Sequence, residues 1–476
     1  MSALTSAGVF VALCGGTVSS LREQIAARPA TSSGALPGGL TAVAVAVALA
    51  AGLTAVAARL GPVSATPATA AWWLPLPAGR RGLLRGELRR VVSLAVAAAL
   101  AVGLPVVLAW TRTLTGVLTG LTAGALMAGA GVGVLVVRQA DWSTRWVPSA
   151  AGAIAALALI GPAAAGCLAV AAGARVPWGA ASSTAPVTTG LLLVLLAAAG
   201  ASLVAADRQL AALSAGSLRA SGETAQYATA SVLSLDTREL GRALHRPTCR
   251  PGRRRVWRWV RSPWHAVVAG DLAVLTRTPW RWGQLAVGAA LPVLAARTEG
   301  LAELPALVAV SVVLGWGIAA TALGEPSRRA AASPAPDRSL PMDGREVVWA
   351  RAIVPAAGLA LVCGVSAVLV GQGTGSPLAW FALGMAAGPA WAGATVRAGY
   401  RPDLDWSGPV LASPMGAVPV GVSSTLVRGP DVGVLGTAPM ALALLLGKAP
   451  WWLVGAQLVW SLAIAATAVG TAQKRN

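Results

Sequence analysis

The sequence predicts an all-α polytopic membrane protein with about twelve transmembrane helices, arranged as two parallel six-helix repeats. Three observations favour this fold class. Of 476 residues, 56% are hydrophobic and only 11% are charged. The apolar residues gather in runs of about 20, which is the length that crosses a ~30 Å hydrocarbon core. Arginines cluster in alternate loops, and some of these loops resemble one another. A soluble chain needs more charged surface, so a water-soluble enzyme or a nucleic-acid binder is excluded.

Apolar runs bounded by charge, Trp or Gly/Pro clusters define the expected spans. We expect helices throughout, because backbone groups in lipid must pair within their own segment. The first six runs lie at 4–20, 38–60, 91–110, 115–137, 148–171 and 187–206, and the second six at 282–298, 304–323, 352–371, 376–396, 432–447 and 450–470. The chain therefore divides into a first half, 1–206, a basic cytoplasmic connector, 207–264, and a second half, 265–476, that begins with an interfacial helix.

The distribution of basic residues predicts the orientation. With the N-terminus inside, 31 of the 37 Lys and Arg residues fall on the cytoplasmic side and 6 fall outside. Because positively charged loops stay in the cytoplasm, both termini are expected there. The net charge of +20 is then mostly a topology signal that faces the anionic lipids of a bacterial plasma membrane.

The most basic stretch, 249–264, interleaves Arg with Trp and continues into a segment with two further Trp residues. Such a pattern can bind nucleic acid, but in a loop that enters a membrane span it favours an interfacial helix with Trp at headgroup depth. The expected membrane-interface anchors are Trp257, Trp259, Trp264, Trp280 and Trp282. Nucleic acid is not expected as a partner.

An internal duplication is predicted from the polar loops. Loops 61–90 and 324–351 each open with Gly and Pro, pass through a Pro/Ala/Ser stretch and reach Leu-Pro and then Gly-Arg, with the Gly-Arg pairs 265 residues apart. Independently, Asp-Trp-Ser occurs at 141–143 and at 405–407, an offset of 264. Two six-span copies share one orientation, so their symmetry axis would be parallel to the membrane normal.

The sequence offers little for chemistry within the membrane. All seventeen acidic residues fall in loops or at span ends, so carboxylate-based ion coupling is not expected. The four cysteines form no CxxC pair and the two histidines are isolated, so neither a metal nor a cofactor is predicted. Catalytic elbows, zinc motifs and a Walker A sequence are also missing, so we expect no enzyme activity, and any ATP hydrolysis must come from another chain.

A short cytoplasmic segment that reads Leu-Pro, then Gly-Arg, then a helix into the third of six spans resembles the permease subunits of ABC-2-type exporters. Within that superfamily the chain looks like uncharacterised actinobacterial permease-like proteins. The resemblance implies six spans preceded by an interfacial helix, and a coupling helix that docks on a separate ABC ATPase dimer at the cytoplasmic face. The second half is the fuller copy, because the first half has no interfacial helix before its first span, which leaves a reduced copy or an incomplete N-terminus.

The docking positions that this resemblance implies lie in the two repeated loops. They are Leu74, Pro75, Gly79, Arg80 and Arg81 in the first half, and Leu340, Pro341, Gly344, Arg345 and Glu346 in the second. Pro would interrupt the chain before the helix, and Arg would offer a charged fork to an acidic groove. The structural alternative is that these arginines only anchor a loop at the headgroups, and Asp-Trp-Ser is then an N-cap beside an interfacial Trp.

Other classes of membrane protein stay open. A major-facilitator-like secondary carrier also has twelve spans in two parallel halves, but loop 61–90 is longer than the corresponding loop of that family and the expected spans hold no charge. A non-transport membrane scaffold protein or a membrane-embedded transferase would fit the same span pattern. The substrate cannot be inferred, because Ala, Val, Leu and Gly faces suit apolar cargo and bare helix packing equally.

Overall fold

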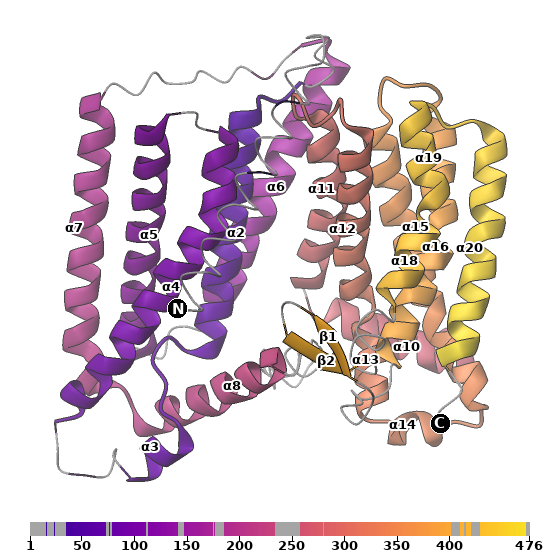
Figure 1. Ribbon diagram of the computed structural model, residues 1–476. Coiled ribbons are helices and arrows are strands. Elements are labelled where there is room, and N and C mark those ends of the chain that lie inside the picture. The colour runs from indigo at the N-terminus through magenta and orange to yellow at the C-terminus, as the bar shows by residue number, and fades with distance from the viewer. Residues whose placement is uncertain are drawn as a thin grey trace. The chain divides into compact units, whose positions relative to one another are not determined.

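The structure is a computed structural model, and it consists mainly of long helices (Figure 1). It describes residues 35–72, 76, 79–110, 113–140, 147–174, 176, 185–233, 258–278, 280–400, 410–413, 416–419 and 429–472, together with residues 16 and 23. The described chain forms two compact units. Unit 1 contains 1–31, 38–158 and 177–248, and unit 2 contains 32–37, 159–176 and 249–476.

The helices up to residue 233 include one at each of the five expected spans between 38 and 206. They are α2 (Gly38–Leu60), α3 (Pro67–Trp72), α4 (Arg80–Trp110), α5 (Leu114–Ala140), α6 (Val147–Ala171), α7 (Ala185–Gln209), the short 3₁₀ helix η2 (Leu210–Ala212) and α8 (Ala215–Leu233). Of these, α4 begins eleven residues before the expected run, and α3, η2 and α8 are additional elements. Within unit 1, α5 packs against α4 and α7.

Unit 2 contains more elements, several of them short. They are α10 (Pro263–Thr276), α11 (Trp280–Arg297), α12 (Pro305–Leu323), α13 (Glu325–Ala332), α14 (Ala335–Arg338), α15 (Gly344–Val370), α16 (Pro377–Gly399), β1 (Val410–Ser413), β2 (Gly416–Pro419), α18 (Pro430–Gly436), α19 (Ala438–Leu446) and α20 (Trp451–Ala472). The strands β1 and β2 form one antiparallel hairpin, with Val410 opposite Pro419.

Eight described helices are long and apolar enough to cross a membrane: α2, α4, α5, α6, α7, α12, α15 and α20. Many of their large side chains are exposed, among them Leu94, Leu157, Leu168 and Val459. Apolar faces of this extent are stable when lipid covers them. The chain is therefore a helical membrane protein that crosses the bilayer several times.

Helices occupy eleven of the twelve positions at which spans were expected, while the twelfth position, 4–20, lies outside the described residues apart from Gly16. Three of the eleven, at α11, α16 and the pair α18–α19, are not among the eight helices that meet the length and apolarity criteria. The number twelve therefore stays a prediction.

Close backbone packing holds unit 2 together. A methyl group added to Gly288 of α11 would lie 2.6 Å from the carbonyl oxygen of Gly315 in α12, so the two backbones touch at this point. Small residues permit such contact, and close packing is what drives helix association in lipid. The fully buried Trp316 and Trp380 belong to the same core, which α12, α15, α16 and α20 share.

The expected span at 432–447 is two short helices. The chain breaks at Thr437, two residues before Pro439, and the break frees carbonyl oxygens at the end of α18. Side chains of α20 satisfy them. Gln457 donates to the Gly436 carbonyl at 2.8 Å, and the Trp460 indole donates to the Leu435 carbonyl at 2.8 Å. Irregular backbone at membrane depth is stable only when its polar groups are paired in this way.

Candidate functional site

The second of the two repeated loops and the helix α10 together form a layer at one end of unit 2 (Figure 1). We call this layer the collar and define it as α10, α13, α14 and the first two turns of α15. Two ionic clusters hold the collar together, and both join residues from several elements.

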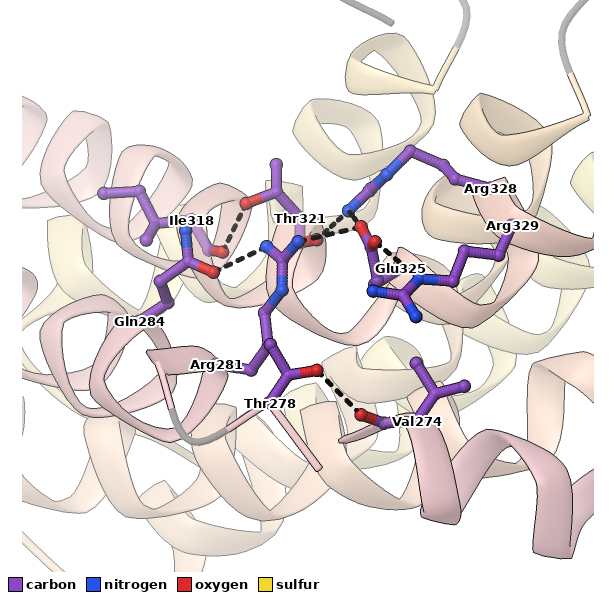
Figure 2. A network of polar contacts seen from close by, with 9 residues as sticks. All are labelled: Val274, Thr278, Arg281, Gln284, Ile318, Thr321, Glu325, Arg328 and Arg329. Atoms are coloured by element: carbon purple, nitrogen blue, oxygen red, sulfur yellow. Dashed lines mark hydrogen bonds and ion pairs between the residues drawn. The ribbon is translucent and has the colours of Figure 1, made fainter. Parts of the chain in front are cut away.

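The first cluster is centred on Glu325, at the beginning of α13 (Figure 2). Its carboxylate binds Arg281 from the first turn of α11 at 2.8 Å, Arg328 at 3.0 Å and Arg329 at 2.9 Å. The spacings of three and four residues place Arg328 and Arg329 beside Glu325 on the same helical face. Arg281 also donates to the Gln284 side chain at 2.7 Å. This cluster therefore ties α13 to the start of α11.

The electrostatics of this cluster favour the charged carboxylate. Burial alone would raise the pKa of Glu325, but the hydrogen bonds and charges of Arg329, Arg281 and Arg328 outweigh it and hold the pKa below its ordinary value. Arg328 also donates to the Thr321 carbonyl near the end of α12, where a cation is favourable beside the helix dipole. With three guanidinium groups around one carboxylate, the cluster carries two excess positive charges.

The second cluster is centred on Arg351, in the second turn of α15. Its guanidinium binds Asp271 of α10 at 2.5 Å and holds Asp337 of α14 through two bonds of 3.1 and 2.5 Å. Asp271 is 1% exposed, and its second carboxylate oxygen has no hydrogen-bond partner. The buried hydroxyl of Tyr400, directly after α16, lies beside the same guanidinium.

Burial raises the pKa of Asp271 to about 7, against the opposing attraction of Arg351 and with a further increase from Asp337. Burial likewise raises the pKa of Tyr400 to about 12. The Arg351 guanidinium therefore binds two carboxylates, and the buried Asp271 carboxyl group keeps its proton up to a pH near 7. The expectation that acidic residues stay in loops placed Asp271 in an interfacial segment and did not reveal that its side chain is buried.

The predicted docking residues of the second half lie in the first turn of α15, which belongs to the collar, and in the short connection from α14 to α15. Pro341 and Arg345 are exposed, Leu340 is half-buried, and Gly344 is the first residue of α15. The Glu346 carboxylate accepts a hydrogen bond from the backbone amide of Asp343 at 3.3 Å and completes a capping box. Glu346 therefore has a structural role in starting α15, while Arg345 projects its charge into solvent.

The corresponding residues of the first half are only partly described. Leu74 and Pro75 lie outside the described residues, and Gly79 and Arg80 are exposed at the start of α4. Arg81 is less available for docking than Arg80, because it forms an ion pair with Asp207 of α7. Arg85 binds the same carboxylate at 2.7 and 2.9 Å, so Asp207 fastens α4 to α7.

The beginning of the first repeated loop is fixed by uncharged hydrogen bonds, in addition to the ion pairs that two arginines of α4 form with Asp207. The buried Gln139 side chain, at the end of α5, accepts from the Val63 amide at 3.2 Å and donates to the Val63 carbonyl at 2.9 Å. The Ala65 amide donates to the Leu218 carbonyl of α8 at 3.1 Å. Each repeated loop is thus held against its own unit, although by different groups.

The Trp anchors are placed as follows. Trp259, Trp264 and Trp282 are exposed by 39%, 38% and 56%, whereas Trp280 is half-buried and Trp257 lies outside the described residues. Trp259 contacts the His265 ring edge to face, with centroids 5.7 Å apart, beside the Ser262 cap of α10. The Asp-Trp-Ser sequences at 141–143 and 405–407 lie outside the described residues.

Sequence reasoning missed the acidic members of both clusters, although signals for them were present. Glu325 precedes two arginines by three and four residues, which predicts a local ion pair. Asp271 is the one charge within an apolar stretch, and a charge in such a stretch needs a partner. In the described part of the chain, no group of three or more His, Cys, Asp or Glu side chains is placed to hold a metal ion.

Comparison with known proteins gives a family without an assigned activity. Residues 32–409 match the model of a family of unknown function, DUF6297, and this match covers most of the chain. The protein therefore belongs to that family. No curated protein and no solved structure matches it.

Proposed function

We propose that the protein is the membrane-spanning permease subunit of an ATP-driven exporter and that a separate ABC ATPase dimer binds its cytoplasmic face. The observation that carries this proposal is the collar. The loop between α12 and α15 is folded into α13 and α14 and is bound by ion pairs to α11 and α15. Arg351 of α15 also binds α10, and Arg345 is exposed to solvent. A loop built in this way is suited to receive a partner.

The ion pairs make the collar suitable for transmitting motion. Arg351 lies within α15 and binds both α10 and α14, so a force applied to the exposed loop would act directly on α15. Glu325 connects the same loop to α11. Fixed elements of this kind carry small displacements better than flexible loops, because packed helices move as rigid bodies.

The proposal includes twelve spans in two parallel repeats. Packing order within each unit supports it, because α4 packs against α5 and α5 against α7, as α15 packs against α16 and α16 against α20. Similarly, α2 contacts α4 and α12 contacts α15. The match is imperfect at α6, whose counterpart in the second repeat is the broken pair α18–α19.

The proposed orientation places the collar in the cytoplasm of a bacterium. The collar carries Arg328, Arg329, Arg338 and Arg345, and basic residues are retained on the cytoplasmic side during insertion. Both chain termini are proposed to be cytoplasmic for the same reason. Anionic lipids of the inner leaflet would lie beside the exposed Trp259 and Trp264.

The test is co-purification of the tagged full-length chain from the membranes of its own host, followed by identification of bound proteins by mass spectrometry. We expect an ATPase with a Walker A motif in stoichiometric amount. Charge reversal of the two exposed docking arginines, Arg80→Glu with Arg345→Glu, should release it, because repulsion would replace attraction at an acidic groove.

The matched control is Arg219→Glu with Arg277→Glu. Both residues are exposed, on α8 and at the end of α10, and the double change alters the net charge equally. The control pair should retain the ATPase. If the wild-type chain carries no ATPase after mild chemical cross-linking, or if both double variants lose it equally, the proposal is wrong. Transport that continues without ATPase and stops when the proton gradient collapses would indicate a secondary carrier.

A further inference from the structure

The Arg351 cluster contains an imbalance that its packing does not remove. Asp271 and Asp337 approach one guanidinium from two different elements, and Asp271 is almost completely buried. With both carboxylates ionised, the cluster carries one excess negative charge in a place with little access to water. Like charges that share a buried partner make one group retain its proton.

No nearby cation corrects the imbalance. The charged and titratable groups of α13 are engaged in the other cluster, and on α10 itself His265 lies at the opposite end, beside Ser262. The groups on elements that pack around Asp271 are Arg351 on α15, Asp337 on α14, Tyr400 after α16, and Glu325, Arg328 and Arg329 on α13. Arg351 is the only cation in this group that binds Asp271 in the described chain.

An unsatisfied atom marks where a proton would be accommodated. The second carboxylate oxygen of Asp271 has no hydrogen-bond partner in the structure, although it is buried. A neutral carboxylic acid can donate through the free oxygen, whereas a carboxylate leaves a charged atom unpaired. Arg351 and Asp337 then remain as a balanced pair with two bonds.

We propose that Asp271, Arg351 and Asp337 form a proton-sensitive latch, which fastens α10 to α15 while Asp271 is protonated and loosens when Asp271 loses its proton. The latch belongs to unit 2 alone and does not depend on an ATPase. It would make the attachment of α10 responsive to cytoplasmic pH.

The direction of the pH effect follows from linkage. In the fastened state the pKa of Asp271 is about 7, above the ordinary value of 3.8 that the side chain regains when α10 detaches and exposes it to water. The fastened state therefore binds the proton more tightly. Attachment is strongest in acid and weakens by up to about tenfold per pH unit as the pH rises toward 7, after which it levels off.

The test measures hydrogen exchange of the α10 amides in the full-length protein in lipid nanodiscs from pH 5 to 8, with exchange times scaled for the intrinsic pH dependence. We expect the protection factor of α10 to fall up to about tenfold per unit between pH 5 and 7 and to change little above 7. With Asp271→Asn, protection should be independent of pH.

A second variant distinguishes titration from a structural role. Asp337→Asn leaves Asp271 as the only carboxylate bound to Arg351, so the guanidinium stabilises the ionised form of Asp271 more strongly. The midpoint of the α10 protection profile should therefore move to lower pH. The matched control is Asp431→Asn, which removes a carboxylate paired with Arg397 at 3.2 Å elsewhere in unit 2 and should retain the wild-type profile. A flat wild-type profile, a pH dependence that persists in Asp271→Asn, or an unshifted midpoint in Asp337→Asn would overturn the latch.

Discussion

Replacing Arg351 by Met tests the cluster that holds the collar together. The guanidinium side chain is 12% exposed and its partners Asp271 and Asp337 are 2% and 16% exposed, so this is a buried ion triad and not a surface pair. Met occupies a similar volume and cannot pair with either carboxylate. The change therefore leaves Asp271 and Asp337 without their cationic partner, while the packing stays largely intact.

The expected loss depends on pH. Removing one partner of a buried ion pair typically costs about 3–5 kcal/mol, because the other charge remains desolvated. Asp271 has a native-state pKa of about 7, above its unfolded value of 3.8, so its proton-bound form stabilises the native state at low pH and that contribution is lost as the pH rises toward 7. Without Arg351, Asp271 loses the charge that opposes its burial and holds its proton more tightly still. We expect the full loss at pH 8 and a much smaller one at pH 5.5.

The assay is thermal unfolding followed by a thiol-reactive fluorophore. Cys363 is fully buried in α15 and reacts only when unit 2 opens, so it reports unfolding in a background where Cys14, Cys167 and Cys249 are replaced by Ser. A loss of this size corresponds to a decrease in Tm of roughly 10 °C at pH 8.

Neutralising both carboxylates in the Arg351→Met background, with Asp271→Asn and Asp337→Asn, should restore most of the stability, because no buried charge is left unpaired. The reasoning would be refuted if Arg351→Met unfolded at the wild-type temperature at pH 8. It would also be refuted if the triple variant were no more stable than Arg351→Met.

Two smaller changes test other contacts. Gly315→Ala adds a methyl group where the α11 and α12 backbones touch and should destabilise unit 2 by about 1–3 kcal/mol. The control, Gly455→Ala, places its methyl group in open space on α20 and should be neutral or slightly stabilising. Equal Tm values for the two variants would contradict the close contact. Glu346→Ala should lower the free energy of unfolding by about 0.5–2 kcal/mol, whereas Glu346→Gln should not, because Gln preserves the capping box. Both variants should retain a bound ATPase. Loss of the ATPase in Glu346→Gln would assign this residue to docking.

The positions of the long helices were largely predictable from the sequence, whereas their ends were less so. The run expected at 38–60 is α2, because Pro37 and Gly61 bound it on both sides. The run expected at 91–110 begins at Arg80 in the structure, since hydropathy detects where a helix enters lipid and not where it begins in water. The break at Thr437 was missed because its flanking residues are as apolar as those of a continuous span.

The site was less predictable, because its contacts join distant residues. The repeated loops indicated where to look, and Arg345 is exposed, while its role in docking stays a prediction. Composition could not show that Arg351 meets a carboxylate 80 residues earlier, nor that Arg81 is engaged by Asp207. Pairing across such separations depends on which helices pack together, and that is determined by close contacts such as Gly288 with Gly315.

Arginine side chains bind α15 near both of its ends. Arg351 ties its second turn to α10 and α14, and at its far end Arg297 of α11 donates to the Leu369 and Gln372 carbonyls, while the Gln372 side chain donates to the Cys167 carbonyl at 3.3 Å. The helix has 27 residues and is therefore about 40 Å long, more than the ~30 Å hydrocarbon core. Because α15 is longer than the bilayer is thick and is bound by side chains at both ends, a displacement of one end would reach the other end without being absorbed by a flexible loop.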